Sequence, residues 1–277
     1  MARKYIVTGS HGFIGSHLVS KLGEGNCWCI DWKIGKDAAR PSDYPKEDGQ
    51  FDAIFHLAGH IHDGYPPNEI LANNTSSTMR VLEEAKRLKA KVIFVSSAGV
   101  YADLPGPQRE DGNLDYSASS YATSKRIGEE LCQLYWRRCG VPAVVLRLFN
   151  AYGPRGNSVI NTWHGLILKR EKVLVNGNGE HERDYVHVKD AVDALVSARN
   201  YLEKSPSYDV FNVGTGVGTE LLGLMSMMMR IYGITVPHGF SGKPGGVRYS
   251  RASTQRCLER MGFRTSIGLE EGLKMLE

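Results

Sequence analysis

The sequence predicts an α/β protein whose core is a doubly wound parallel sheet with helices on both faces. Strand-like and helix-like segments alternate through the first 150 of the 277 residues. The strand candidates are almost continuously apolar, which is the pattern of parallel strands covered on both faces. Beyond residue 150 the elements become shorter, and Gly and Pro become more frequent. The alternation of strands and helices up to residue 150 indicates a parallel core, and the shorter elements that follow indicate a smaller α/β lobe.

The individual elements follow from local patterns. Five apolar runs are expected to form core strands, at residues 5–8, 27–31, 53–57, 92–96 and 143–149. Helices are expected at 14–22, 76–88, 121–139, 188–202, 220–232 and 254–261. The helix at 76–88 carries an apolar stripe at three-residue steps, formed by Met79, Leu82, Ala85 and Leu88. We assign residues 1–150 to the core, with 173–188 returning to it, and 151–277 mainly to the smaller lobe.

The composition is that of an ordinary globular chain, with 42% apolar and 23% charged residues. Lys and Arg number 34 and Asp and Glu 30, so the net charge of +4 is mild, and it is scattered along the chain. This argues against nucleic acid or an anionic membrane as a partner. No apolar stretch reaches 18 residues, so no transmembrane helix is expected. The five cysteines are odd in number and lack metal-binding spacing, so we expect a reduced, cytoplasmic protein without a metal site.

A glycine-rich loop, Gly9-Ser-His-Gly12-Phe-Ile-Gly15, joins the first expected strand to the first helix. Glycines at such a place allow a tight turn, close approach of the backbone to a pyrophosphate, and packing of the helix on the strand. Amides at the N-terminus of the helix then face the phosphates. Asp31 ends the second strand, where its carboxylate can accept both hydroxyls of a ribose and would repel a 2′-phosphate. The sequence therefore predicts a dinucleotide site that prefers NAD to NADP.

A second group of residues suits proton transfer. Tyr121 and Lys125 are spaced i and i+4 in an expected helix, so they share one face. A phenol, with a reference pKa of about 10, needs a nearby cation to act as a base. Ser97 follows the fourth strand, at the carboxyl edge where such sheets bind ligands. We expect Tyr121 to be the acid/base, Lys125 to lower its pKa, and Ser97 to orient the reacting oxygen.

These motifs, in this order, resemble the extended short-chain dehydrogenase/reductase family, and within it the NAD-dependent nucleotide-sugar epimerases and dehydratases of the UDP-glucose 4-epimerase type. The likeness extends over nearly the whole chain. Further matching segments are His56-Leu-Ala-Gly59, Asn74, Ser96-Ser-Ala-Gly-Val-Tyr101, Arg147-Leu-Phe-Asn150-Ala-Tyr-Gly-Pro154, Gly177-Asn-Gly179, Arg183-Asp-Tyr-Val-His-Val188, Phe211-Asn-Val-Gly214 and Lys243-Pro-Gly. The resemblance implies a Rossmann-type fold in which Ser97, Tyr121 and Lys125 are catalytic.

The resemblance also implies which residues bind NAD and a nucleotide-diphosphate sugar. Cofactor contacts are expected from Gly9, His11, Gly12, Phe13, Ile14, Gly15, Asp31, Leu57, Ala58, Gly59, Asn74, Ser96, Tyr121 and Lys125. Substrate contacts are expected from Ser97, Ala98, Tyr121, Asn150, Arg183 and Lys243. Arg183 would reach the diphosphate, because its planar fork binds phosphate oxygens in pairs. The helices at 76–88 and 121–139 resemble the pair that forms dimers in this family, which implies a homodimer.

The chain departs from the family pattern in two places. Only 20 residues separate Asp31 from Asp52, where relatives usually fit a helix, a strand and another helix. We therefore expect the sheet to be shortened there and the family's acidic contact to adenine to be absent. Lys243-Pro-Gly-Gly246 stands where many relatives carry Arg-x-Gly-Asp. The diphosphate clamp would keep a cation at Lys243 but lose the paired geometry.

The implied reaction is epimerisation of a nucleotide-linked sugar at C4, through a transient 4-keto sugar. In this family the 4,6-dehydratases carry an Asp-Glu pair after the hydroxyl residue, and the decarboxylases carry a Glu where this chain has Gly99. Ala98 and Gly99 supply no carboxylate, and an epimerase needs none. An NAD(P)H-dependent reductase of a keto-sugar and a cofactor-bound member without turnover remain as alternatives.

Two histidines, His60 and His62, follow the strand at 53–57. Their spacing fits a metal pair, but no third ligand is evident. Contact with substrate is a second interpretation. A solvated loop is the interpretation that the sequence favours.

Overall fold

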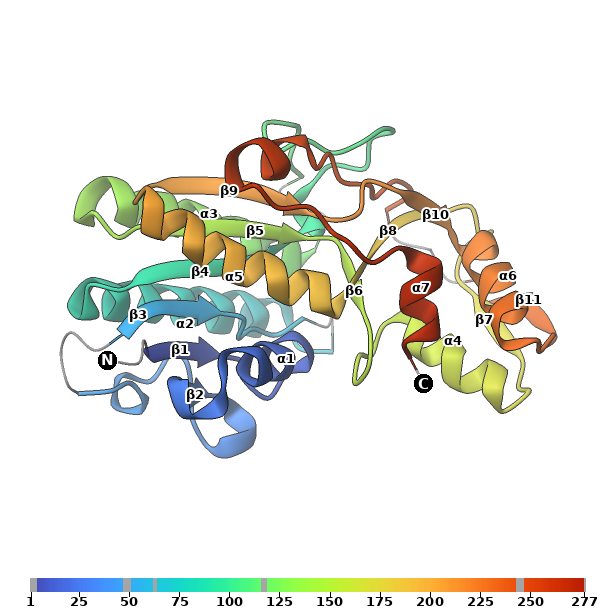
Figure 1. Cartoon of the computed structure of the whole chain (residues 1–277), viewed down its shortest axis with the longest axis horizontal. Helices are drawn as coiled ribbons and strands as arrows, with labels where there is room; N and C mark the ends of the chain where they lie inside the picture. Colours follow the sequence, from blue (N-terminus) through green and yellow to red (C-terminus); the bar gives the residue numbers. More distant parts are fainter. Residues whose placement is uncertain (1–3, 47–50, 62–63, 116–118, 243–246, 277) are drawn as a thin grey trace. The chain divides into compact units, whose positions relative to one another are not determined.

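The largest sheet has six strands in the order β2-β1-β3-β4-β5-β9 (Figure 1). The computed structural model describes residues 4–46, 51–61, 64–115, 119–242 and 247–276. The strands of this sheet are β1 Lys4–Thr8, β2 Cys27–Ile30, β3 Phe51–His56, β4 Lys91–Ser97, β5 Ala143–Leu148 and β9 Tyr208–Val213. β1 pairs in parallel with β2 and β3, and β3 pairs in parallel with β4. The expected parallel α/β sheet is thereby confirmed.

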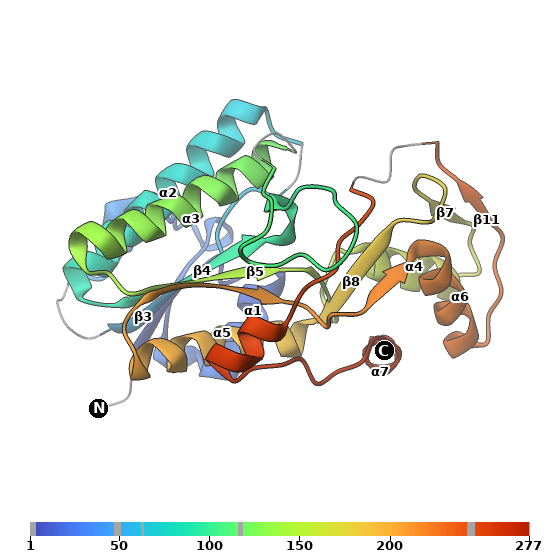
Figure 2. The ribbon, with the colours of Figure 1, turned by 90° about the horizontal axis from the view of Figure 1, so that it is seen from above.

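Helices cover both faces of this sheet. Figure 2 shows α2 and α3 on one face and α1 and α5 on the other. Their bounds are α1 Phe13–Leu22, α2 Pro67–Leu88, α3 Ser120–Cys139 and α5 Val188–Lys204. α2 begins nine residues earlier than its apolar stripe predicts, because its first turns carry asparagines and hydroxyl residues. Met79, expected in that stripe, is 47% exposed, whereas Leu82, Ala85 and Leu88 are buried.

The sheet ends at β2, as the short connection to β3 predicts. Between these strands the described residues form only two short 3₁₀ turns, Trp32–Ile34 and Pro41–Asp43. This connection folds back against β2. The Trp28 indole of β2 donates to the Asp43 carbonyl at 2.8 Å, and Tyr44 is buried with its hydroxyl on the Ala38 carbonyl at 2.8 Å. Within the part of the chain that the structure describes, no strand or α-helix replaces the missing unit.

The chain divides into two interleaved units. The first comprises residues 1–102, 113–147 and 192–211 and holds the large sheet. The second comprises 103–112, 148–191 and 212–277. Its strands are β6 Asn150–Tyr152, β7 Val173–Val175, β8 Glu182–His187, β10 Gly218–Glu220 and β11 His238–Phe240. Its helices are α4 Val159–Leu168, α6 Leu221–Tyr232, α7 Leu269–Lys274 and a π-helical turn at Cys257–Met261.

Residues 173–188 do not return to the core sheet, which corrects our expectation. β7 pairs with β11, and β8 pairs with β6 and β10. The segment that returns is 192–211, which brings β9 beside β5. The reason lies in the burial of β7. Leu174 is 53% exposed between buried Val173 and Val175, the alternation of a strand covered on one face only.

The helices found within the described ranges include none that is both long and apolar enough to span a bilayer.

Substitution of Gly128 tests the packing of α3 on β4. A Cβ atom at Gly128 would overlap the ring of Phe94 on β4. We expect Gly128→Ala to lower the free energy of unfolding by about 1–3 kcal/mol, because overpacking forces the helix away from the strand. Gly165→Ala in α4 is the control, since nothing lies within 4 Å of its added Cβ. Urea denaturation would contradict this account if both variants were as stable as the wild type.

Candidate functional site

The glycine loop forms a backbone cradle at the start of α1. Gly9 has φ +70°, and a Cβ there would lie 2.8 Å from the Ala58 nitrogen. A Cβ at Gly15 would overlap the Gly9 carbonyl oxygen. Gly12 is the N-cap of α1. No side chain caps the helix by a hydrogen bond there, and the first turn of α1 has no acidic residue. The first amides of the helix, from Phe13 and Ile14 onward, therefore suit the phosphates of a dinucleotide.

Asp31 is fixed beside this cradle. Its carboxylate accepts the His11 backbone N–H at 2.8 Å through Oδ2 and the Lys33 backbone N–H at 3.0 Å through Oδ1. Each carboxylate oxygen can accept about two hydrogen bonds, so one acceptor position on each remains beyond these two bonds. Two free acceptors side by side match two neighbouring hydroxyls of a ribose. The residues present thus fit the adenosine half of NAD.

The loop after β3 is held from both sides. The Leu57 N–H donates to the Thr8 carbonyl at 3.1 Å, and the Ala58 N–H donates to the Thr8 hydroxyl at 3.3 Å. Asn74 of α2 is buried, and its amide accepts the His60 N–H at 2.8 Å and donates to Ser124 of α3 at 2.8 Å. A Cβ at Gly59 would lie 3.2 Å from the Asn74 Oδ1. In this structure Asn74 therefore positions the 57–60 loop against α3.

The structure brings Ser97, Tyr121 and Lys125 together in the first unit. Ser97 ends β4, and its side chain is hydrogen-bonded to the Tyr121 hydroxyl. Its Oγ also accepts the Gly99 N–H at 3.1 Å, at the 3₁₀ turn Ala98–Val100. The Lys125 ammonium donates to the Val95 carbonyl at 2.9 Å and lies 5.6 Å from the centre of the Tyr121 ring. Phenol, hydroxyl and ammonium are thus within reach of one another, as the sequence predicts.

Burial moves the two pKa values of this group in opposite directions. Burial raises the pKa of Tyr121 to about 12, against the hydrogen bond from Ser97, which lowers it. Burial lowers the pKa of Lys125 to about 8, while Cys132 and Glu129 act to raise it. Burial, with the charge of Lys125 as a second cause, lowers the pKa of His56, the last residue of β3, to about 3. At neutral pH the site therefore holds a neutral phenol, a largely protonated lysine and a neutral imidazole.

Ser96 has a partner inside the protein. Its hydroxyl donates to the buried Glu129 carboxylate at 2.6 Å. Successive side chains of a strand point to opposite faces, so the side chains of Ser96 and Ser97 lie in different environments. Sequence reasoning missed Glu129, although its spacing of four residues from Lys125 and the charge of Arg147 inside an apolar strand were available signals.

The expected substrate residues lie in the second unit. Asn150 begins β6 and donates to the Asp184 carbonyl at 3.1 Å. Arg183 lies on β8 and donates to the Glu182 carbonyl at 2.8 Å. Burial lowers the pKa of Arg183, with Tyr185 and Asp103 opposing the shift. Lys243 lies outside the described residues.

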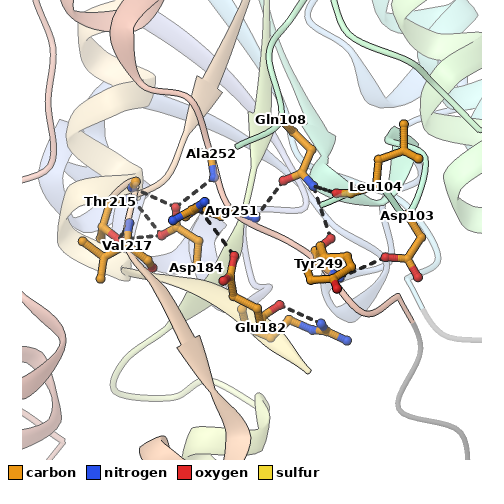
Figure 3. Close-up of polar contacts among 12 residues, drawn as sticks. Asp103, Leu104, Gln108, Glu182, Asp184, Thr215, Val217, Tyr249, Arg251 and Ala252 are labelled. Atoms are coloured by element: carbon orange, nitrogen blue, oxygen red, sulfur yellow. Dashed lines mark hydrogen bonds and ion pairs between the residues drawn. The ribbon is translucent and has the colours of Figure 1, made fainter. Parts of the chain in front are cut away.

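Asp184, which follows Arg183 on β8, joins several segments of the second unit through hydrogen bonds (Figure 3). Its buried carboxylate accepts the Thr215 N–H at 2.8 Å, the Thr215 hydroxyl at 2.6 Å and the Ala252 N–H at 3.1 Å. Burial raises the pKa of Asp184, and these hydrogen bonds act to lower it. β8 is thereby tied to two loops, at 214–217 and 248–253. Sequence reasoning missed this role because all partners are distant in sequence.

Hydrogen bonds to the loop at 248–253 fix the segment 103–112. Gln108 accepts the Arg251 N–H at 2.7 Å through its side-chain oxygen (Figure 3). Its backbone carbonyl accepts the Ser253 N–H at 2.8 Å. Asp103 accepts the backbone N–H groups of Arg248 and Tyr249 at 2.8 and 2.9 Å. The segment between Ser97 and Tyr121 in sequence thus contributes residues 103–112 to the second unit.

His60 has local partners that favour the loop interpretation. Its ring lies 4.2 Å from that of Tyr65, and its Nε2 is hydrogen-bonded to the Asn73 amide at 2.6 Å. His62 lies outside the described residues. Among the residues that are described, no group of three or more His, Cys, Asp or Glu is placed to hold a metal ion.

Comparison with known proteins decides the family. Residues 5–214 match the model of the NAD dependent epimerase/dehydratase family. The chain belongs to this family. The UDP-glucose 4-epimerase of Thermotoga maritima, solved with UDP-glucose, is 28% identical, with a TM-score of 0.85 and coverage of 99% of this chain and 97% of that one. MoeE5, solved with UDP-glucose and NAD, is 27% identical, with a TM-score of 0.85 and the same coverage.

Decarboxylases are also among the similar proteins. The UDP-N-acetyl-alpha-D-glucosaminuronate decarboxylase of Bacillus cytotoxicus is 27% identical over 99% of this chain and 96% of its own length. Membership in the NAD-dependent epimerase/dehydratase family makes the protein an enzyme with NAD as its cofactor. The cradle at Gly9, Gly12 and Gly15 and the two free acceptors of Asp31 agree with that cofactor.

Replacement of Asp31 tests the cofactor preference. We expect Asp31→Ala to bind NAD more weakly and NADP more strongly, because the acceptors for the ribose hydroxyls and the charge that repels a 2′-phosphate are both lost. Titration of both dinucleotides by calorimetry measures the change. A wild-type protein that prefers NADP would show that Asp31 does not select the cofactor.

The depressed pKa of Lys125 predicts how stability depends on pH. Between about pH 8 and 10.5 the unfolded chain binds a proton that the folded chain has released, so stability rises with pH in this window. We expect wild type to gain about 2–3 kcal/mol over Lys125→Met between pH 7 and pH 10. Chemical denaturation of both proteins across this range measures the difference. A constant difference would mean that Lys125 titrates normally.

Proposed function

We propose that the protein epimerises a UDP-linked sugar at C4 through a 4-keto intermediate. The observation that carries this proposal is a complete Ser97, Tyr121 and Lys125 set with no carboxylate at the two positions that follow Ser97. A Cβ at Gly99 would lie 3.4 Å from the Ser97 Oγ and 3.9 Å from the Ala122 Cβ. A side chain at 99 would therefore border the reacting group. The family resemblance implies a Glu at this position in decarboxylases, and this chain has no side chain there.

Each residue has a role in the proposed reaction. Tyr121 takes the proton of the C4 hydroxyl and later returns it. Lys125 favours the tyrosinate through its positive charge, and Ser97 orients the reacting oxygen. NAD, when bound, supplies the acceptor for the hydride of the sugar carbon and gives it back. Because the keto group is reduced again, no cofactor is consumed and no acid at C5 or C6 is required.

The choice of UDP rests on the similar structures. The epimerase of Thermotoga maritima and MoeE5 were both solved with UDP-glucose. Arg183 lies half-buried on β8 and, with Lys243, is proposed to bind the diphosphate, and Asn150 is proposed to contact the substrate. Decarboxylation is the second candidate, because a decarboxylase is as similar in sequence. Gly99 argues against it. Reduction of a keto-sugar would use the same three residues in one direction only.

Product analysis distinguishes these reactions. We expect incubation with UDP-glucose, UDP-N-acetylglucosamine, UDP-glucuronate or dTDP-glucose, each with catalytic NAD, to yield a C4 epimer from at least one UDP-sugar without net NADH. NMR of the products identifies the epimer. Loss of water, loss of carbon dioxide, or stoichiometric oxidation of a reduced cofactor by a keto-sugar would reject the proposal.

Removal of the phenol hydroxyl tests the acid/base. Tyr121→Phe should lower kcat by about 10²–10⁴-fold, because general acid–base catalysis typically contributes that much. NAD binding should persist, since the glycine cradle and Asp31 are untouched. Near-normal turnover in a variant that still binds NAD would place the base elsewhere.

A further inference from the structure

A buried carboxylate lies one helical turn beyond Lys125. Glu129 of α3 is 0% exposed. Its Oε1 accepts the Ser96 hydroxyl at 2.6 Å and the Arg147 Nε at 3.0 Å. Its Oε2 accepts the Arg147 Nη2 at 2.7 Å and the Arg126 Nη1 at 3.2 Å. Burial of a charge is costly unless it is paired and hydrogen-bonded, and Glu129 satisfies both conditions.

Glu129 is linked to the chain on both sides of Ser97, directly through Ser96 and indirectly through Arg147. Ser96 immediately precedes Ser97 on β4. Arg147 of β5 donates to the Tyr101 hydroxyl at 2.9 Å and lies 4.9 Å from the centre of its ring. Tyr101 directly follows the 3₁₀ turn that Ser97 begins. One carboxylate on the helix of Tyr121 and Lys125 is therefore connected to the chain on both sides of Ser97.

We propose that Glu129 is a positioning residue, which fixes Ser97 relative to Tyr121 and keeps Lys125 protonated, with Arg147 holding Glu129 in place. The inference rests on the proposed roles of Tyr121 and Lys125. It assigns Glu129 no contact with substrate or cofactor.

The groups around Lys125 support a charge effect from Glu129. On its own helix Lys125 faces Tyr121, Glu129 and Cys132, and from β3 it faces His56, whose burial keeps the imidazole neutral. β4 contributes the Val95 carbonyl and the ring of Phe94, which lies 5.2 Å from the ammonium. Burial lowers the pKa of Lys125 to about 8, and Cys132 and Glu129 oppose this. The thiol of Cys132 is kept neutral, because burial raises its pKa. Glu129, which also pairs with Arg126 and Arg147, is therefore the carboxylate that opposes the loss of the proton from Lys125.

The experiment compares the pH profile of kcat in wild type, Glu129→Gln and the double variant Glu129→Gln with Arg147→Met. Breaking one side of a buried pair is strongly destabilising, whereas replacing both sides often is not, so the double variant keeps the test possible if the single variant fails to fold. Loss of the negative charge should lower the pKa of Lys125. The alkaline limb of kcat should move to lower pH by about 1 unit in Glu129→Gln. It should move less far in the double variant, because loss of the Arg147 positive charge partly offsets loss of the Glu129 negative charge. At pH 8 kcat should fall about 10–100-fold through misplacement of Ser97, with a change in KM for the sugar nucleotide of less than about 3-fold.

The matched control is Asp52→Asn. Asp52 pairs with Lys91 and Arg199 at the start of β3, the strand end opposite to Ser97 on β4. This variant breaks an ion-pair cluster of the same unit without altering the charge near Lys125. Its alkaline limb should match that of wild type. If the Glu129 variants and Asp52→Asn lose activity with equal, unshifted pH profiles, Glu129 has a structural role only and the inference is wrong.

A second measurement does not depend on turnover. It compares the effect of Lys125→Met on stability, as a function of pH, in the wild-type and double-variant backgrounds. In the double-variant background this effect should begin to change at a lower pH, by up to about 1 unit, because Lys125 loses its proton earlier there. An unchanged onset would overturn the charge effect. If wild type epimerises no sugar but this onset shifts, the proposed function fails while the role of Glu129 toward Lys125 stands.

Discussion

The close packing of α3 on β4 is the contact on which the active site depends. Gly128 has no side chain, and the ring of Phe94 occupies the space that a Cβ would need. Lys125, Gly128 and Glu129 share one buried face of α3, since residues three and four apart are neighbours on a helix. This approach lets the Lys125 ammonium reach the Val95 carbonyl and the Glu129 carboxylate reach Ser96. A larger residue at 128 would separate both groups from the strand that carries Ser97.

Local patterns made much of the site predictable. The glycine loop, Asp31 and the i, i+4 spacing of Tyr121 and Lys125 each involve residues that are close in sequence, and the structure places them as expected. The shortened connection after β2 follows from chain length alone. Three features were not predictable, because they depend on partners that only the fold brings near. They are the start of α2, the return of residues 192–211 to the core, and the hydrogen bonds from Thr215 and Ala252 to Asp184. The hydroxyl of Ser96 illustrates the difference, since nothing local shows that Glu129 would accept from it.

The short connection after β2 leaves few residues beside the glycine loop. β2 is at the end of the sheet, and Asp31, the expected ribose contact, caps the 3₁₀ turn that follows it. Asp31 is held by two backbone N–H groups rather than by side chains, so its direction is set by the main chain. A carboxylate fixed in this way would lose little conformational entropy on binding a ribose, as the expected role of Asp31 requires.

The effect of burial on Tyr121 and Lys125 sets a condition for the proposed role of Tyr121 as a base. A phenol with a pKa of about 12 and a lysine with a pKa of about 8 would be neutral and largely protonated at neutral pH. A tyrosinate requires additional positive charge close to the ring. Part of that charge is the protonated Lys125, which Glu129 is proposed to keep protonated. In the proposed reaction, an oxidised nicotinamide bound beside Tyr121 would supply further positive charge. On that proposal, proton removal by Tyr121 would depend on cofactor binding.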